Sequence, residues 1–157
     1  MDYNLVTFTQ DKTYVGLRYG KGTNMPAFWD HFTHKLYTSA LVADLIEGHE
    51  AIGYRRYKED RSSDFTHEYY AACQLRRPTK DLCGFERIVI PKGDYLLFPV
   101  RYSHKDADIT EILTEHLPIL TEKYPLDASY DFEYYTEQFD YKDNKTYLYL
   151  AIPLLAG

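Results

Sequence analysis

The stretch Tyr130-Asp-Phe-Glu-Tyr-Tyr135 decides much of how this chain is interpreted. It places two carboxylates among four aromatic residues, in a run with the composition of a β-strand. Side chains alternate between the two faces of a strand, so Asp131, Glu133 and Tyr135 share one face and the other aromatic residues share the opposite one. Glu133 can point to solvent, as strand carboxylates usually do, or stand in a pocket walled by rings. In a pocket it would act as a receptor for a cation.

Outward from this strand, the chain divides into two halves with the same order of elements. We expect strands over 3–9, 13–19, 52–58 and 65–75 in the first half, and over 85–90, 95–102, 130–139 and 146–154 in the second. Between them, one helix should begin near Met25, capped by Asn24 or Thr23, and a second near Asp108. Pro118 should end or kink the second helix.

Apolar residues recur at helical spacing in both predicted helices and mark their buried faces. The stripes comprise Phe28, Phe32 and Leu36 in the first helix, and Ile109, Ile112, Leu113, Leu117 and Leu120 in the second. We therefore predict an α+β fold with an antiparallel sheet and two main helices. Its two β-α-β-β modules, of the SHS2 type, would span about 3–78 and 84–155 in a pseudo-twofold arrangement.

Length and composition favour one globular domain over residues 1–157. The chain has 157 residues, 45% of them hydrophobic, and no low-complexity linker. It contains no apolar run long enough for a membrane span, and its first residues lack the pattern of a signal peptide. We expect a cytoplasmic protein without a membrane partner.

The charge pattern disfavours direct binding of nucleic acid. The net charge is −6, and acidic residues dominate the stretch 106–143. Such a field repels phosphates and attracts cations. The short basic runs at Arg55-Arg56-Tyr-Lys58 and Arg76-Arg77 are too small to outweigh it.

No cofactor or metal site is predicted. Cys73 and Cys83 lack the spacing of a zinc site, and both are expected to be ordinary thiols. His31 and His34 lie at helical spacing but have no further ligands at a recognisable interval, so a solvated helix face is the better interpretation. The sequence contains no G-x-S-x-G, P-loop or G-x-G-x-x-G motif.

Several segments together resemble the GyrI-like small-molecule-binding domain, also called the bacterial transcription-activator effector-binding domain. They are Phe85-Glu-Arg-Ile-Val-Ile-Pro-Lys-Gly-Asp-Tyr-Leu-Leu-Phe98, His116-Leu-Pro118, Asp131-Phe-Glu-Tyr-Tyr135, Tyr147-Leu-Tyr-Leu-Ala-Ile-Pro-Leu154 and Tyr69-Tyr-Ala-Ala-Cys73. The resemblance covers almost the whole chain. It implies two strand-helix-strand-strand modules around a site for amphipathic ligands.

In multidrug-sensing members of that family, a buried glutamate meets the cationic centre of the ligand and aromatic rings hold its flat body. By this resemblance Glu133 is the glutamate, Tyr135 the aromatic residue two positions later, and Trp29 an aromatic residue of the first helix. Tyr54 and Tyr70 complete our set of expected ligand-binding residues. His116 stands where the family often has tryptophan, and a glycine usual in the family is missing around Tyr102–Lys105.

The resemblance predicts a stand-alone binding module for amphipathic, cationic aromatic small molecules, since Tyr3 already begins the sensor domain and no helix-turn-helix precedes it. Such a module would sequester its ligand or report it to a protein partner, which the sequence does not identify. Two alternatives stay open. Glu133 could serve as a general base in a hydrolase of small molecules, or the chain could inhibit DNA gyrase by surface contact.

Overall fold

The computed structural model describes residues 2–20, 22–46, 50–58, 61, 67–77 and 79–156. Its strands are β1 (Asn4–Phe8), β2 (Lys12–Arg18), β3 (Ala51–Tyr57), β4 (His67–Gln74), β5 (Glu86–Ile90), β6 (Gly93–Arg101), β7 (Tyr130–Tyr135) and β8 (Tyr147–Pro153). Its α-helices are α1 (Met25–Tyr37), α2 (Lys105–Glu111) and α3 (Leu117–Leu120), with short 3-10 turns at Ala40–Asp44 and Tyr102–His104. No helix among the described residues is long and apolar enough to span a bilayer.

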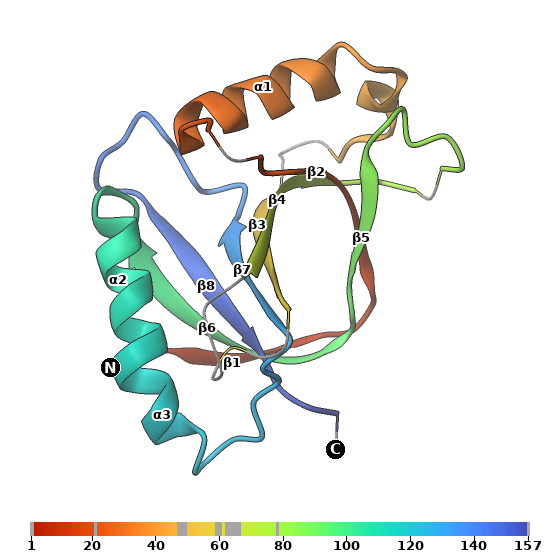
Figure 1. The fold of residues 1–157 in the computed structure, drawn as a ribbon. Helices are drawn as coiled ribbons and strands as arrows, with labels where there is room; N and C mark the ends of the chain where they lie inside the picture. Colours follow the sequence, from red (N-terminus) through yellow and green to blue (C-terminus); the bar gives the residue numbers. More distant parts are fainter. Residues whose placement is uncertain are drawn as a thin grey trace.

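The eight strands form one antiparallel sheet in the order β1-β6-β8-β7-β3-β4-β2-β5. The sheet curls strongly, with α1 over one half and α2 and α3 along the other (Figure 1). Its middle is the pair β3 and β7, where Gly53 lies opposite Glu133 and Arg55 opposite Asp131. The α+β fold with an antiparallel sheet and two main helical regions is thus confirmed.

Because side chains alternate between the two faces of each strand, the sheet has buried hydrophobic residues on both faces, and they form three clusters. The inner face of the curl is filled by aromatic and aliphatic residues, including Tyr14, Tyr70, Tyr95 and Phe132. On the outer face, one cluster packs under α1 and a second under α2 and α3. The predicted helix stripes supply both outer clusters, because every stripe residue is buried except Leu113, which packs against the second cluster.

Most predicted boundaries agree with the structure within about two residues. Asn24 caps α1, its Oδ1 accepting a hydrogen bond from the backbone N–H of Ala27 at 2.8 Å. The strand expected over 130–139 ends earlier, at Tyr135. The first two residues of the strand expected over 65–75 lie outside the described residues.

The sheet order divides into β2-β4-β3 and β6-β8-β7, which have corresponding positions in the two halves of the chain. β1 pairs with β6 and β5 pairs with β2, so each half supplies its first strand to the other. This exchange accords with repeats over 3–78 and 84–155. The repeats and their pseudo-twofold axis stay a prediction.

The second helical region departs from expectation in two ways. It begins at Lys105, three residues before Asp108, whose carboxylate instead accepts hydrogen bonds from the backbone and side chain of Arg101. Pro118 does not end the helix, which reaches Leu120. The preceding turn, Ile112–His116, widens into a π-helix, an arrangement that re-routes backbone hydrogen bonds where the helical pattern is disturbed.

Candidate functional site: a buried ionic cluster on β3 and β7

Charged side chains lie on the outer face of the central strand pair, between the clusters covered by the two helical regions. Asp131 and Glu133 of β7 and Arg55 of β3 point to this face and are all buried, with Glu133 only 3% exposed. Arg61 joins them from the segment after β3. Buried charges are costly unless they are paired, so the partners of each carboxylate matter.

Asp131 is completely paired. Its Oδ1 accepts from Arg55 Nε at 2.7 Å, and its Oδ2 accepts from the Tyr57 hydroxyl at 2.6 Å and from Arg61 Nε at 3.0 Å. Burial acts to raise the pKa of Asp131, but the two guanidinium groups and the Tyr57 hydroxyl hold it below its ordinary value. Asp131 is therefore a structural anion.

Glu133 has a different set of partners. Its Oε1 accepts from the Tyr135 hydroxyl at 2.8 Å, the Tyr69 hydroxyl at 3.1 Å and Lys105 Nζ at 3.3 Å. Within the part of the chain that the structure describes, its Oε2 accepts only from Arg55 Nη1, at 3.4 Å. Three donors from three elements thus converge on one oxygen, whereas the other oxygen has a single long contact.

The two tyrosines stay protonated at Glu133. Burial, followed by the charge of Glu133, raises the pKa of both Tyr69 and Tyr135 well above the usual value. Both hydroxyls are therefore permanent donors near neutral pH. They orient the carboxylate without neutralising it.

Gly53 makes this arrangement possible. A Cβ built on Gly53 would lie 2.7 Å from Glu133 Oε1 and nearer still to the Tyr69 hydroxyl oxygen. Any larger residue would push Tyr69 and Glu133 apart. The sequence held a signal for this residue, because a glycine inside a strand often marks a close approach of other groups.

Trp29, a ligand-binding residue by the resemblance, lies beside this cluster, and its part in binding stays a prediction. This half-buried residue of α1 donates from Nε1 to the Tyr69 hydroxyl at 3.3 Å. Its ring lies 5.7 Å from the ring of Tyr135 in an edge-on arrangement. Phe139 closes the other side of Tyr135 at 4.9 Å. Trp29, Tyr69, Tyr135 and Phe139 form an aromatic wall beside Glu133.

The structure corrects the grouping of Tyr54 and Tyr70 with Glu133. Both rings lie in the inner-face cluster, 6.2 Å apart. Tyr54 is paired with Phe132 across the strands, so it has the opposite parity to Glu133. The tyrosine of β4 that reaches Glu133 is Tyr69, the immediate neighbour of Tyr70.

Arg55 belongs to a short basic run in the sequence, but strand alternation turns its side chain inward. Its Nη2 is buried and has no hydrogen-bond partner among the described residues. An unpaired buried donor is unfavourable by about 1–3 kcal/mol. A ligand acceptor placed beside Nη2 would remove that cost.

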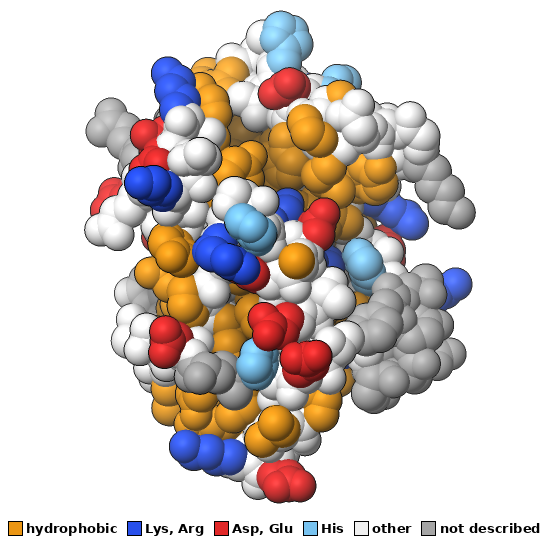
Figure 2. Space-filling view, turned by 90° about the vertical axis from the view of Figure 1, so that its left-hand side faces the viewer, with side chains coloured by type: hydrophobic (Ala, Val, Ile, Leu, Met, Phe, Trp, Pro, Cys, Tyr) orange, Lys and Arg blue, Asp and Glu red, His pale blue; other side chains and the backbone are white. Residues whose placement is uncertain are grey.

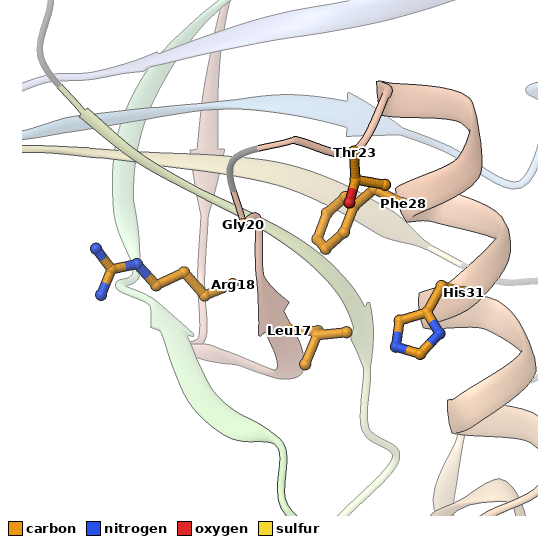
Figure 3. Close-up of a pocket in the computed structure, with 6 residues that line it drawn as sticks. All are labelled: Leu17, Arg18, Gly20, Thr23, Phe28 and His31. Atoms are coloured by element: carbon orange, nitrogen blue, oxygen red, sulfur yellow. The ribbon is translucent and has the colours of Figure 1, made fainter.

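A surface pocket of about 430 Å³ lies between the end of β2 and α1 (Figure 3). Its lining residues are Leu17, Arg18, Gly20, Thr23, Phe28 and His31. Phe28 also packs on Tyr69, with ring centroids 6.4 Å apart, but Glu133 does not line the pocket. Figure 2 shows a hollow with hydrophobic walls at the level of α1, on the side where α2 lies.

Other predicted features lie away from the cluster. No group of three metal-ligating side chains occurs in the part of the chain that the structure describes. Burial raises the pKa of the Cys73 thiol to about 12, which leaves it protonated and unreactive. His116 lies in the π-helical turn, 4.0 Å from Glu111.

The arrangement of the sheet and its helices is shared with several solved structures. The protein SAV2435, solved with tetraphenylphosphonium bound, matches with a TM-score of 0.67 and 16% identity over 99% of this chain and 95% of that one. The C-terminal domain of EcmrR matches with a TM-score of 0.68 and 11% identity over 99% and 98%. At these low identities the similarities show a shared fold.

The sequence itself gives the family. The profile of Cass2, described as an integron-associated effector binding protein, matches residues 8–153, so the chain belongs to this family. The integron cassette protein VCH_CASS2 of Vibrio cholerae has the same fold, with a TM-score of 0.53 and 17% identity over 98% of this chain and 95% of that one. No curated protein matches the chain in sequence. The predicted GyrI-like membership and small-molecule binding are confirmed.

Proposed function

We propose that this effector-binding domain takes amphipathic aromatic small molecules that carry a positive charge. Glu133 would supply the counter-charge, and Trp29, Tyr69 and Tyr135 would contact the rings of the ligand. The observation that carries the proposal is the Glu133 carboxylate, buried beside an aromatic wall and oriented by two neutral hydroxyl donors. A buried carboxylate attracts a cation far more strongly than an exposed one, because water no longer screens it.

The fold comparison supports the same ligand class. SAV2435 was solved with tetraphenylphosphonium, a cation with four aromatic rings. Face-on contact of a cation with each ring contributes about 0.5–2 kcal/mol, depending on desolvation. Two or three rings and one carboxylate are sufficient for micromolar affinity, about −8 kcal/mol.

Calorimetry with the wild-type protein and a Glu133→Gln variant tests the proposal. Tetraphenylphosphonium should bind the wild type, and the substitution should weaken binding by about 1–3 kcal/mol, since glutamine keeps the volume but not the charge. The binding of triphenylphosphine oxide, a neutral aromatic compound used for comparison, should weaken little. Equal losses for both compounds, or none for either, would show that Glu133 is not the counter-charge.

The hydrolase alternative has weaker support. A general base needs a free lone pair directed at the proton it removes. Oε1 of Glu133 already accepts from two hydroxyls and an ammonium group, and Oε2 faces Arg55. Neither oxygen therefore has a lone pair directed at a substrate proton without first losing one of these partners.

A further inference from the structure

Lys105 occupies an unexpected position for a lysine. It is the first residue of α2, where the positive end of the helix dipole disfavours a cation. Its side chain leaves the helix and reaches the buried carboxylate, with Nζ 3.3 Å from Glu133 Oε1 and 3.5 Å from the Tyr135 hydroxyl. The ammonium group therefore lies against the aromatic wall, at the place where the proposed function requires the positive charge of a ligand.

The two cations at Glu133 differ in how firmly they are held. Arg55 is fixed by its 2.7 Å bond to Asp131, and its side chain is 10% exposed. Among the described residues Lys105 has no such anchor: besides Glu133, its ammonium group has a hydrogen bond only to the Tyr135 hydroxyl, and its side chain is 18% exposed. A lysine ammonium on a flexible four-carbon stem is also well hydrated once it reaches solvent. Lys105 can leave the site, whereas Arg55 cannot leave without exposing Asp131.

We propose that Lys105 is a built-in competitor that occupies the cation position of the site until a ligand displaces it. This inference rests on the proposed function, because it assigns the cation position to the same carboxylate. When a cationic ligand enters, its positive centre replaces Nζ at Oε1 and the lysine moves into solvent. Glu133 exchanges one cation for another and is never left without one.

This exchange gives the site a selectivity that the carboxylate alone would lack. A neutral ligand that displaces Lys105 removes a charge-assisted hydrogen bond and supplies no charge in return. A neutral ligand that leaves Lys105 in place is kept away from Oε1. Lys105 therefore weakens the binding of every ligand, and it weakens the binding of neutral ligands most.

Titration of a Lys105→Met variant with tetraphenylphosphonium tests the competition. Methionine keeps an unbranched chain of similar length but removes the ammonium group. Affinity should rise about tenfold, the change expected from losing one charge-assisted contact that the ligand no longer has to break. Lys92→Met is the matched control: Lys92 lies exposed between β5 and β6, and this variant has the same net charge. It should bind like the wild type.

A double-variant cycle separates competition from steric relief. In a Glu133→Gln background there is no anion to compete for, so adding Lys105→Met should leave the affinity unchanged. A tenfold gain in that background would mean that the lysine only blocks space, and no gain in the Glu133 background would overturn the proposal. If tetraphenylphosphonium binds neither the wild type nor Lys105→Met, the proposed function itself fails.

Discussion

Two buried carboxylates stand two residues apart on the same face of β7, yet their surroundings differ. The Asp131 carboxylate accepts hydrogen bonds from Arg55, Arg61 and Tyr57, and all three are buried. Glu133 is held by two hydroxyls, by Lys105, which is anchored only at this site, and by one long contact to Arg55. Burial alone therefore does not identify a binding site. What distinguishes Glu133 is that one of its cationic partners can leave.

The largest difference between the two acids should appear in stability. Asp131→Asn should lower the free energy of unfolding by about 3–5 kcal/mol, because it leaves two buried guanidinium groups without their anion. Glu133→Gln should cost only about 1 kcal/mol, since Lys105 can turn to solvent and Arg55 keeps Asp131. Urea unfolding of both variants measures the difference. Similar losses would remove the distinction between a structural and a ligand-directed carboxylate.

The pH dependence of stability should isolate the Asp131 contribution. The pKa of Asp131 is lower in the folded state than in the unfolded one, so its contribution is present above the unfolded value and is lost as pH falls through the folded value. The gap in unfolding free energy between the wild type and Asp131→Asn should be constant near neutral pH and narrow below about pH 4.

Asp108→Asn provides the control for this measurement. Asp108 also has a lowered pKa, caused first by its hydrogen bond from Arg101, but the Arg101 side chain is exposed. The difference in unfolding free energy between the wild type and Asp108→Asn should therefore stay below about 1 kcal/mol at every pH. A gap for Asp131→Asn that does not change down to pH 2 would contradict the linkage.

A smaller effect on stability is expected at Gly53, the residue of β3 that lies opposite Glu133 of β7. Gly53→Ala should place a methyl group against the Tyr69 hydroxyl and Glu133 Oε1, costing about 1–3 kcal/mol in stability and abolishing the Tyr69–Glu133 hydrogen bond. Gly20→Ala meets no atom within 4 Å and serves as the control. Thermal unfolding compares the two variants, and an equal, small effect would show that the close approach at Gly53 is easily relieved.

The sequence predicted the fold well because strand alternation and helix stripes are local patterns. The cap at Asn24, the buried stripe of α1 and the parity of β7 all follow from residues a few positions apart. Glu133, Tyr135 and Trp29, which the family resemblance groups together, do lie close to one another, while their role in binding stays a prediction.

The missing members of the site depend on contacts between distant segments. Tyr69 and Tyr70 are both aromatic neighbours in β4, and only the pairing of β4 with β3 decides which of them faces Glu133. Arg55 could not be assigned to Asp131 without the pairing of β3 with β7. For Lys105 the reason is local: the sequence pattern predicts a helix start at Asp108 and so puts Lys105 in the preceding loop, whereas α2 begins at Lys105 itself.

The smallest effect is expected from substitutions of the two neighbouring tyrosines of β4, Tyr69 and Tyr70. Tyr69→Phe removes a donor to Glu133 Oε1 and the acceptor of Trp29 Nε1, so the carboxylate is less firmly oriented and the indole loses its partner. Tetraphenylphosphonium binding should weaken by about 1 kcal/mol, and Trp29 emission should shift to shorter wavelength. Tyr70→Phe removes hydrogen bonds to Glu68 and from Arg56 on the other face, away from Glu133, so both affinity and emission should match the wild type. Fluorescence titration of the two variants decides between the faces of the sheet: a larger loss for Tyr70→Phe would place the ligand inside the curl, and equal losses would mean that neither tyrosine marks the site.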